Sequence, residues 1–246
     1  MTLDRPLTRN VRPDRAPTGL AAYQANGGYQ ALRMTVGKKS PADCLQIIKD
    51  SNLRGRGGAG FPTGMKWSFL PMDNSSPGHK YLICNADEME PGTFKDRLLM
   101  ECDPHQLIEG MILSAYTIQA DIAYIFIRSE YLVAATLLRQ AIVDCYVKGF
   151  LGDNIMGSGY NLNMHVHASA GRYICGEETA LISSLEGKRA TPRAKPPFPQ
   201  VSGLWGRPTI VNNVETLCNI HHILEHGADW FQSLGLTKDA GTKLYG

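Results

Sequence analysis

The sequence predicts an α/β protein with a mostly parallel, Rossmann-like sheet and covering helices. Helix-type and strand-type hydrophobic patterns alternate along the chain, which is typical of such sheets. The clearest strand patterns are short and uniformly apolar, as expected of strands buried on both faces. The chain has 246 residues, of which 43% are hydrophobic and 20% charged, enough for one substantial core. Ligands of this fold class bind beyond the carboxyl ends of the strands.

The N-terminal part predicts an arm followed by a first helix. Residues 1–28 are rich in Arg, Pro, Gly and Asn without periodicity, so they form either an arm lying over a surface or a disordered tail. Ser40 is a good N-cap with Pro41 at the first helical position. Cys44, Leu45 and Ile48 then share one face. We expect this helix to end near Asn52.

The remaining elements are predicted from the period and the length of the hydrophobic patterns. Residues 81–84 form an apolar run closed by the polar turn 85–88, which indicates a buried strand with a polar loop end. Helical spacing then covers 104–119, and a second buried strand covers 122–127. The later predicted elements are helix 131–147, strand 162–167, helix 176–185 and helix 214–226.

Bulk properties exclude several classes of protein. The net charge is +2 and the basic residues are interspersed with acidic ones, so we expect no nucleic-acid partner. The six cysteines are scattered without close metal-ligand spacing, which predicts buried thiols and no metal site. The N-terminus has no signal-like apolar region, and the most apolar stretch, 111–127, is interrupted by polar residues. We therefore expect a soluble protein without direct membrane insertion.

The segment from Gly55 to Gly60 matches the pattern GxGxxG in an unusual context. The dinucleotide fingerprint needs a preceding strand and a following helix, whereas here a helix precedes and 61–64 follow. Lys66 is separated from Gly64 by Met65, so this is not a Walker A loop either. Glycines let a backbone approach a flat ring or a phosphate closely. A flexible linker is the alternative, although interleaved aromatic residues disfavour it.

Four further segments carry polar side chains that could bind a ligand. The turn 85–92 places one amide and three carboxylates just beyond a buried strand, where they could meet ribose hydroxyls or a flavin edge, or be simply solvated. Acidic residues at 177–178 lie in the first turn of a predicted helix. The helix dipole favours acidic residues there, so it alone can explain them without a ligand. The loop 187–199 could clamp a charged aromatic ligand or remain a wet loop, and Asn212 and Asn213 could cap a helix, bind phosphate, or both. The pairs His165/His167 and His221/His222 lack further ligands, so we expect no metal there.

The order of four motifs is distinctive. They are Leu53-Arg-Gly-Arg-Gly-Gly-Ala-Gly-Phe, Cys84-Asn-Ala-Asp-Glu, Gly176-Glu-Glu-Thr and Val211-Asn-Asn-Val-Glu-Thr-Leu. From about residue 18 to its end, the chain closely resembles the NADH-binding flavoprotein subunit of respiratory complex I. NAD-linked hydrogenases and formate dehydrogenases carry the same module.

The resemblance implies FMN and NAD(H) as cofactors and assigns residues to each. Those expected around FMN are Gly55, Arg56, Gly57, Gly58, Lys66, Asn85, Asp87, Gly176, Glu177, Asn212 and Asn213. Aromatic residues expected to stack the adenine are Phe61, Phe69 and Phe198, and those expected near the nicotinamide half are Glu88, Glu90, Tyr173, Glu178 and Lys195. Hydride transfer needs positioning rather than an acid or base, so no catalytic residue is expected.

The resemblance also implies the setting of the chain. The family continues into a small β-rich domain and a helical domain that holds a [4Fe–4S] centre, so we expect a fragment: an arm (1–28), an FMN- and NADH-binding domain (29–240) and the start of a β-rich domain (241–246). The implied activity is NADH dehydrogenase, passing electrons through iron–sulfur clusters towards quinone. The implied partners are other subunits, especially a small iron–sulfur subunit, at a cytoplasmic site peripheral to the inner membrane. The alternatives are a diaphorase module of a hydrogenase or formate dehydrogenase, a free-standing FMN reductase, and an inactive fragment.

Overall fold

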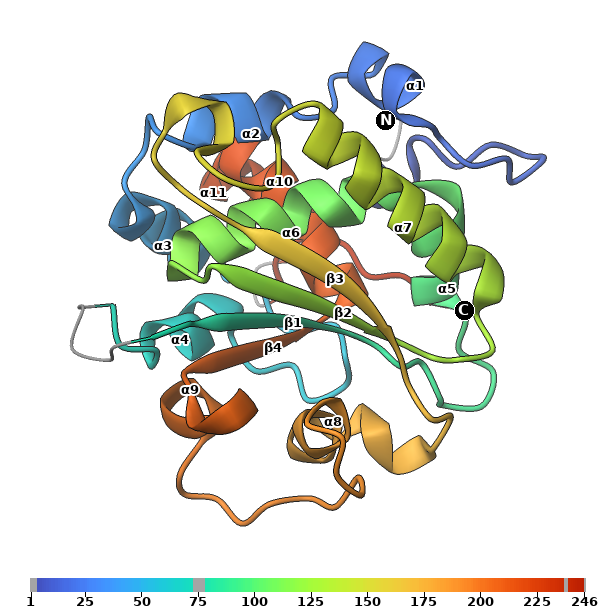
Figure 1. The fold of residues 1–246 in the computed structure, drawn as a ribbon. Coiled ribbons are helices and arrows are strands. Elements are labelled where there is room, and N and C mark those ends of the chain that lie inside the picture. Colours follow the sequence, from blue (N-terminus) through green and yellow to red (C-terminus); the bar gives the residue numbers. More distant parts are fainter. Residues whose placement is uncertain (1–3, 73–77, 237–238, 246) are drawn as a thin grey trace.

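The protein is a three-layer α/β structure around one parallel sheet (Figure 1). The computed structural model describes residues 4–72, 78–236 and 239–245. The described strands are β1 (Tyr81–Ala86), β2 (Ile122–Ile127), β3 (Asn163–Ala168) and β4 (Thr209–Asn213), and all of their pairings are parallel. This architecture confirms the predicted fold class.

The strand order β3-β2-β1-β4 places a topological switch between β1 and β4. The chain moves outward from β1 through β2 to β3 and then returns to add β4 on the opposite side of β1. Asn85 pairs in register with Asn213, so the polar ends of β1 and β4 lie side by side. A crevice opens at such a switch because the connections leave the sheet in opposite directions. The fold therefore directs these two strand ends at one site.

One face of the sheet carries the larger helical layer, with α6 (Pro104–Ile118) and α10 (Val214–His226) at its centre. A Cβ at Gly110 of α6 would overlap the carbonyl of Leu217 on α10, so these helices meet backbone to backbone. The other helices on this side are α1 (Leu20–Ala25), α2 (Gln30–Thr35), α3 (Pro41–Asp50), α5 (Lys95–Cys102), α7 (Leu132–Val147) and α11 (Ala228–Ser233).

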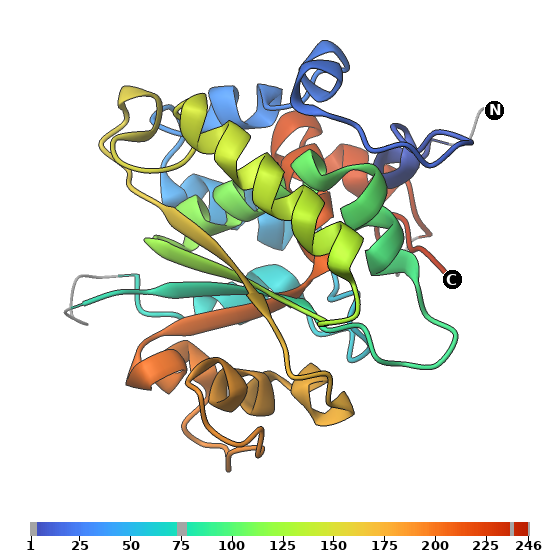
Figure 2. The ribbon, with the colours of Figure 1, turned by 45° about the vertical axis from the view of Figure 1, so that its right-hand side comes forward.

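The opposite face carries a thinner layer made of short helices (Figure 2). Ile83, Phe126 and Val211 point into this layer and pack against Leu181 and Ile182. Its elements are α8 (Glu178–Leu185), α9 (Pro199–Ser202) and the 3-10 turns η3 (Tyr173–Gly176) and η4 (Leu204–Gly206). The short helix α4 (Thr63–Ser68) packs on α3, and two further 3-10 turns are η1 (Pro6–Thr8) and η2 (Ile155–Gly157).

The predicted helices and strands are found, with several ends shifted by one or two residues. The strand predicted at 81–84 continues to Ala86, so Asn85 and Ala86 belong to β1 and not to the predicted turn. The first helix ends at Asp50 rather than Asn52, and its N-terminus is the expected Ser40 cap, closed by a capping box with Asp43. The helix predicted from Gly176 begins at Glu178, because Glu177 is extended and its carboxylate accepts the N–H groups of Thr179 and Ala180. The prediction omitted β4 and the short helices α1, α2, α4, α5, α9 and α11.

The N-terminal segment lies over the helical layer. The N–H of Thr18 donates to the carbonyl of Cys102 at 2.8 Å, and the Asn10 amide donates to Asp103 at 2.8 Å. Residues 1–3 of the predicted arm and Gly246 lie outside the described residues, and the division into an arm, a domain and a following domain stays a prediction. Within the described part, no helix is both long enough and apolar enough to cross a membrane.

Candidate cofactor site

Two adjoining cavities open at the carboxyl ends of β1 and β4. The first, which we call the polar cavity, has a volume of about 840 Å³, and the second, the aromatic cavity, about 770 Å³. Their shared wall consists of Gly55, Gly57, Ala59, Gly60, Asn85, Gly176, Glu177 and Asn213. The glycine-rich loop therefore separates and serves both spaces.

Hydrogen bonds at its base hold the glycine-rich loop in place. The N–H of Gly55 donates to the carbonyl of Phe61 at 2.9 Å, and the N–H of Arg56 donates to the hydroxyl of Thr216 at 2.9 Å. A Cβ at Gly57 would lie 3.1 Å from the Cβ of Asn213, and Gly58 has a φ of 121°. Both positions favour glycine, for space and for backbone conformation. These anchors argue against the flexible-linker interpretation.

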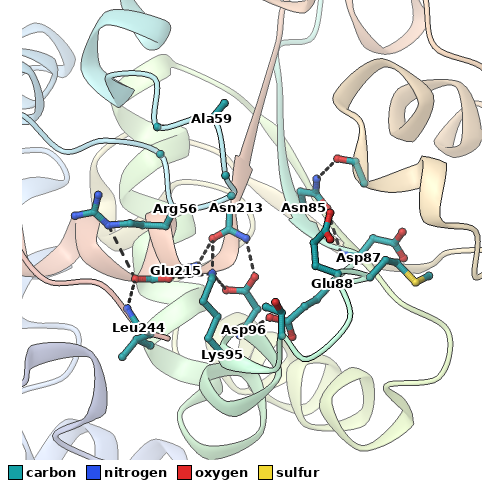
Figure 3. A pocket seen from close by; sticks show the side chains of 18 of the residues that line it. Arg56, Ala59, Asn85, Asp87, Glu88, Lys95, Asp96, Asn213, Glu215 and Leu244 are labelled. Atoms are coloured by element: carbon teal, nitrogen blue, oxygen red, sulfur yellow. Dashed lines mark hydrogen bonds and ion pairs between the residues drawn. The ribbon is translucent and has the colours of Figure 1, made fainter. Parts of the chain in front are cut away.

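The guanidinium of Arg56 turns away from the cavities (Figure 3). It donates to the carbonyls of Arg54, Ala240 and Thr242 at 3.0–3.2 Å and lies 4.0 Å from Glu215. Burial lowers the pKa of Arg56, and Glu215 opposes that shift. The residue lines the polar cavity, but its charged group binds protein rather than facing the cavity.

Asn213 sits at the centre of a charged network beneath the loop (Figure 3). Its side chain caps α10 by accepting the N–H of Glu215 at 3.0 Å and donates to Asp96 at 2.7 Å. Lys95 lies between Asp96, at 2.7 Å, and Glu215, at 2.9 Å. Burial alone would lower the pKa of Lys95, but these two carboxylates raise it above its ordinary value. The network fixes the start of α10 against α5.

The end of β1 and the turn after it use most of their polar groups to hold the protein together. The Asn85 amide donates to the carbonyl of Gly176 at 2.9 Å. One carboxylate oxygen of Asp87 accepts the hydroxyl of Ser169 at 2.6 Å, while the other is buried without a hydrogen-bond partner. Glu88 accepts the N–H groups of Asp96 and Arg97 at the start of α5. Burial raises the pKa of both Asp87 and Glu88.

The aromatic cavity exposes large apolar side chains. Phe61, Phe69 and Phe198 are 47%, 55% and 53% exposed, and the rings of Phe61 and Phe69 lie 6.4 Å apart. Apolar rings at the mouth of a hollow are typical of a ligand site. Phe61 and Phe69 flank α4 and Phe198 directly precedes α9, so two parts of the chain that are far apart in sequence supply the aromatic lining.

Charged residues close the floor of the aromatic cavity. Glu178 binds Lys66 at 2.9 Å and Lys195 at 2.7 Å, which ties α8 to α4 and to the loop before α9. Burial raises the pKa of Glu178, but the two lysines outweigh it and hold the pKa below its ordinary value. The Asn212 amide oxygen accepts the indole N–H of Trp67 at 2.8 Å and so anchors α4.

Every residue predicted for the site lines one of the two cavities, with Glu90 and Tyr173 hydrogen-bonded to each other at the rim. Several lining residues carry no sequence signal for the site, chiefly Thr93, Lys95, Asp96, Glu215, Thr216, Lys243, Leu244 and Tyr245. These residues belong to no recognisable motif, and their role depends on packing. The only local signal is that Glu215 and Thr216 follow the paired asparagines.

The histidine pairs and cysteines play other parts in the structure. His165 and His167 lie on β3, where their rings pack against Tyr124 and Phe126, and His221 and His222 are buried in α10. No group of three or more potential metal ligands occurs among the described residues. All six cysteines are buried and unpaired.

Comparison with known proteins decides the family. Residues 48–222 match the Nuo51 FMN-binding domain. The chain belongs to this family. It is 56% identical to a subunit of the NADH-quinone oxidoreductase of Salmonella typhimurium over 98% of its own length and 54% of that protein. For the corresponding protein of Aquifex aeolicus the identity is 55%, over 99% of this chain and 56% of the relative.

A solved structure shows the same fold. An NAD+-reducing [NiFe]-hydrogenase in its H2-reduced state superposes with a TM-score of 0.80 and 41% identity, covering 93% of this chain and 38% of that chain. The chain spans about half the length of the curated relatives that it matches. These findings confirm the predicted resemblance to a complex I flavoprotein subunit.

The site fits the FMN that the family name specifies. Glycine-loop N–H groups and the N-terminus of α10 suit a phosphate, and the amides and carboxylates suit ring edges and ribityl hydroxyls. A Cβ added at Gly58 or Gly60 would meet no atom within 4 Å, so the loop leaves open space beside its backbone. Family and geometry thus agree on the predicted flavin.

Proposed function

We propose that this chain is the cofactor-binding part of an NADH dehydrogenase, in which FMN receives a hydride from NADH. The observation that carries the proposal is the pair of cavities on either side of one glycine-rich loop. One cavity offers backbone N–H groups, amides and carboxylates, and the other offers three aromatic rings. A polar flavin and an adenine-bearing dinucleotide need those two environments side by side.

The residues of the chain act by positioning. When bound, FMN supplies a ring that accepts a hydride and releases electrons one at a time. The glycine loop and the α10 N-terminus would hold its phosphate-bearing tail, with Asn85 and the turn after β1 along the wall. Phe61, Phe69 and Phe198 would stack the adenine of NADH. No side chain is needed as an acid or base, so we assign no catalytic residue.

The electrostatics of the aromatic cavity support a nucleotide ligand. Lys66 and Lys195 bring two ammonium groups to its floor, and Glu178 bonds both of them. Fixed charges of this kind orient a ligand without rearrangement during the reaction. Glu90 and Tyr173, hydrogen-bonded at the rim, would border the nicotinamide half and limit water there.

We extend the proposal to the whole protein from the complex I flavoprotein family that its motifs resemble. Electrons would leave through iron–sulfur clusters, including a [4Fe–4S] centre in the part of the family not spanned here, towards quinone. Other subunits, among them a small iron–sulfur subunit, would bind this chain on the cytoplasmic side and keep it peripheral to the inner membrane.

A second candidate is the diaphorase module of an NAD-linked hydrogenase. The observation that favours it is the TM-score of 0.80 to an NAD+-reducing [NiFe]-hydrogenase. The higher identity, 56%, to an NADH-quinone oxidoreductase subunit makes the first proposal the stronger one. Copurified partner subunits would separate the two, because a hydrogenase would bring a nickel-containing chain.

The test is a titration of FMN with the purified chain, in which the quenching of flavin fluorescence measures binding. We expect saturable binding of one FMN per chain and, in the loaded protein, NADH oxidation with a soluble dye. Free FMN at every protein concentration would overturn the proposal. Binding without any NADH oxidation would restrict the chain to a flavin-binding role.

A further inference from the structure

We propose that Arg56 is a positioning residue that latches residues 240–245, here called the C-terminal wall, against the glycine-rich loop. The C-terminal wall then forms the outer side of the polar cavity. The inference rests on the proposed function only in taking this cavity as the flavin site; the latch itself is a property of the protein alone.

Each of the three guanidinium nitrogens of Arg56 donates a hydrogen bond to a backbone carbonyl. Its Nε donates to the carbonyl of Thr242 at 3.2 Å, and its two terminal nitrogens donate to the carbonyls of Ala240 at 3.0 Å and Arg54 at 3.1 Å. Only 3% of the side chain is exposed. The planar, forked guanidinium can meet three carbonyls at once, which a lysine ammonium cannot do in this geometry.

Two further anchors hold the same segment. The N–H of Leu244 donates to the carboxylate of Glu215 at 2.9 Å, and Lys95 binds the other oxygen of that carboxylate. Gly241 has a φ of 74° and leaves no room for a Cβ, which would overlap the ring of Phe231. The wall is therefore fixed from both sides, by charges towards the loop and by an aromatic ring behind it.

The position of the wall gives it a role at the site. Lys243, Leu244 and Tyr245 line the polar cavity opposite the turn after β1. They lie beyond residues 48–222, which match the family domain, so the cavity is completed by chain outside that match. Lys243 brings an ammonium group to a cavity that the carboxylates of Glu88, Glu90 and Glu177 also line. Of these four groups, only the ammonium would attract the phosphate of a ligand.

Limited trypsin digestion tests the latch without any cofactor. Trypsin cleaves after Lys243, and the Leu244 N–H of that bond is tied to Glu215 in the intact latch. We expect cleavage after Lys243 to be about tenfold faster in Arg56→Lys, since hydrogen bonds to charged groups are worth that much or more. Arg12→Lys, which alters an exposed arginine paired with Asp14, is the matched control and should leave the rate unchanged.

FMN affinity tests the consequence for the site. We expect Arg56→Lys to bind FMN about tenfold more weakly, while Arg12→Lys binds as the wild type does. Gly241→Ala displaces the wall from its other side without touching Arg56 and should reproduce both effects, even if Arg56→Lys fails to fold. Cleavage after Lys243 at the wild-type rate in both Arg56→Lys and Gly241→Ala would overturn the latch. Faster cleavage with unchanged FMN affinity would overturn its role in the cavity, whereas loss of FMN binding by the wild type would count against the proposed function alone.

Discussion

The amide of Asn213 donates a 2.7 Å hydrogen bond to Asp96, which joins the cap of α10 to the first turn of α5 beneath the glycine-rich loop. The oxygen of the Asn213 amide accepts hydrogen bonds from the N–H of Glu215 and from the ammonium group of Lys95. Asn213 is thus both a helix cap and the support against which Gly57 rests. A change at this residue should affect stability and cofactor binding together.

We expect Asn213→Ala to lower the free energy of unfolding by about 1–2 kcal/mol, because a cap and a buried hydrogen bond are lost. FMN affinity should fall as well. Ser40→Ala removes the comparable cap of α3, far from the cavities, and should cost similar stability with unchanged FMN affinity. Urea unfolding and FMN titration measure both; equal FMN affinities in the two variants would contradict the supporting role of Asn213.

Gly57→Val should abolish retention of FMN and leave the fold intact. A branched side chain there meets Asn213 and narrows the loop where a ring or phosphate must approach. Gly19→Val is the control, since a Cβ at Gly19 meets no atom within 4 Å. Circular dichroism checks the fold and flavin absorbance checks retention. Normal flavin content in Gly57→Val would remove the main support for the site.

Removal of an aromatic ring should weaken dinucleotide binding without loss of FMN. We expect Phe69→Ala and Phe198→Ala each to raise the KM for NADH about tenfold, the order of magnitude that base–aromatic stacking supplies. Phe94→Ala removes an equally exposed ring that lines neither cavity and should have no effect. A raised FMN dissociation constant with an unchanged KM would mean that the rings belong to the flavin site instead.

Acid should destabilise the protein through buried histidines. Burial lowers the pKa of His105 from its ordinary value of 6.5 to about 4, so the unfolded chain binds the proton more tightly than the folded one. Its contribution is complete above pH 6.5 and is lost as pH falls towards 4. At pH 5 the free energy of unfolding should be lower by about 2 kcal/mol through His105 alone.

Glu109 should act in the opposite direction. Burial raises its pKa to about 7, above the ordinary 4.5, although Tyr23 and the N–H groups of Tyr29 and Leu32 oppose the shift. The folded state then holds the proton more tightly, so its contribution is complete below pH 4.5 and is lost as pH rises through 7. Urea unfolding measured from pH 7.5 to 5 gives the free energy of unfolding lost on acidification. Compared with the wild type, this loss should be smaller in His105→Gln and larger in Glu109→Gln. Parallel curves for the two variants would contradict both assignments.

Much of the fold could be predicted because the sequence pattern of most helices and strands lies within the element itself. Ser40 and Pro41 define the start of α3, and the apolar runs of β1 and β2 have no other sensible interpretation. β4 could not be found in the same way. Only Thr209, Ile210 and Val211 carry a strand signal, and the two asparagines that follow suggest a helix cap, which one of them is. The switch between β1 and β4 therefore depends on long-range pairing that no local pattern records.

The site residues could be named from motifs, but their individual roles could not. Arg56 and Glu88 line the polar cavity, yet their charged groups bind the C-terminal wall and the start of α5. Composition tells nothing of which way a side chain turns. Lys95 and Asp96 were missed because they lie outside every motif and reach Asn213 only through the packing of α5 against α10.

The pairing of β4 with β1 also bears on how the protein is made. Tyr81 emerges from a ribosome long before Thr209, its partner in the sheet, and the floor of both cavities needs the two strands together. Contacts this distant along the chain form late, after the closure entropy of the intervening loop has been overcome. A nascent chain with only its first three strands has the glycine-rich loop but nothing for Gly57 to rest upon. Flavin loading must therefore wait until β4 has been made and has paired with β1.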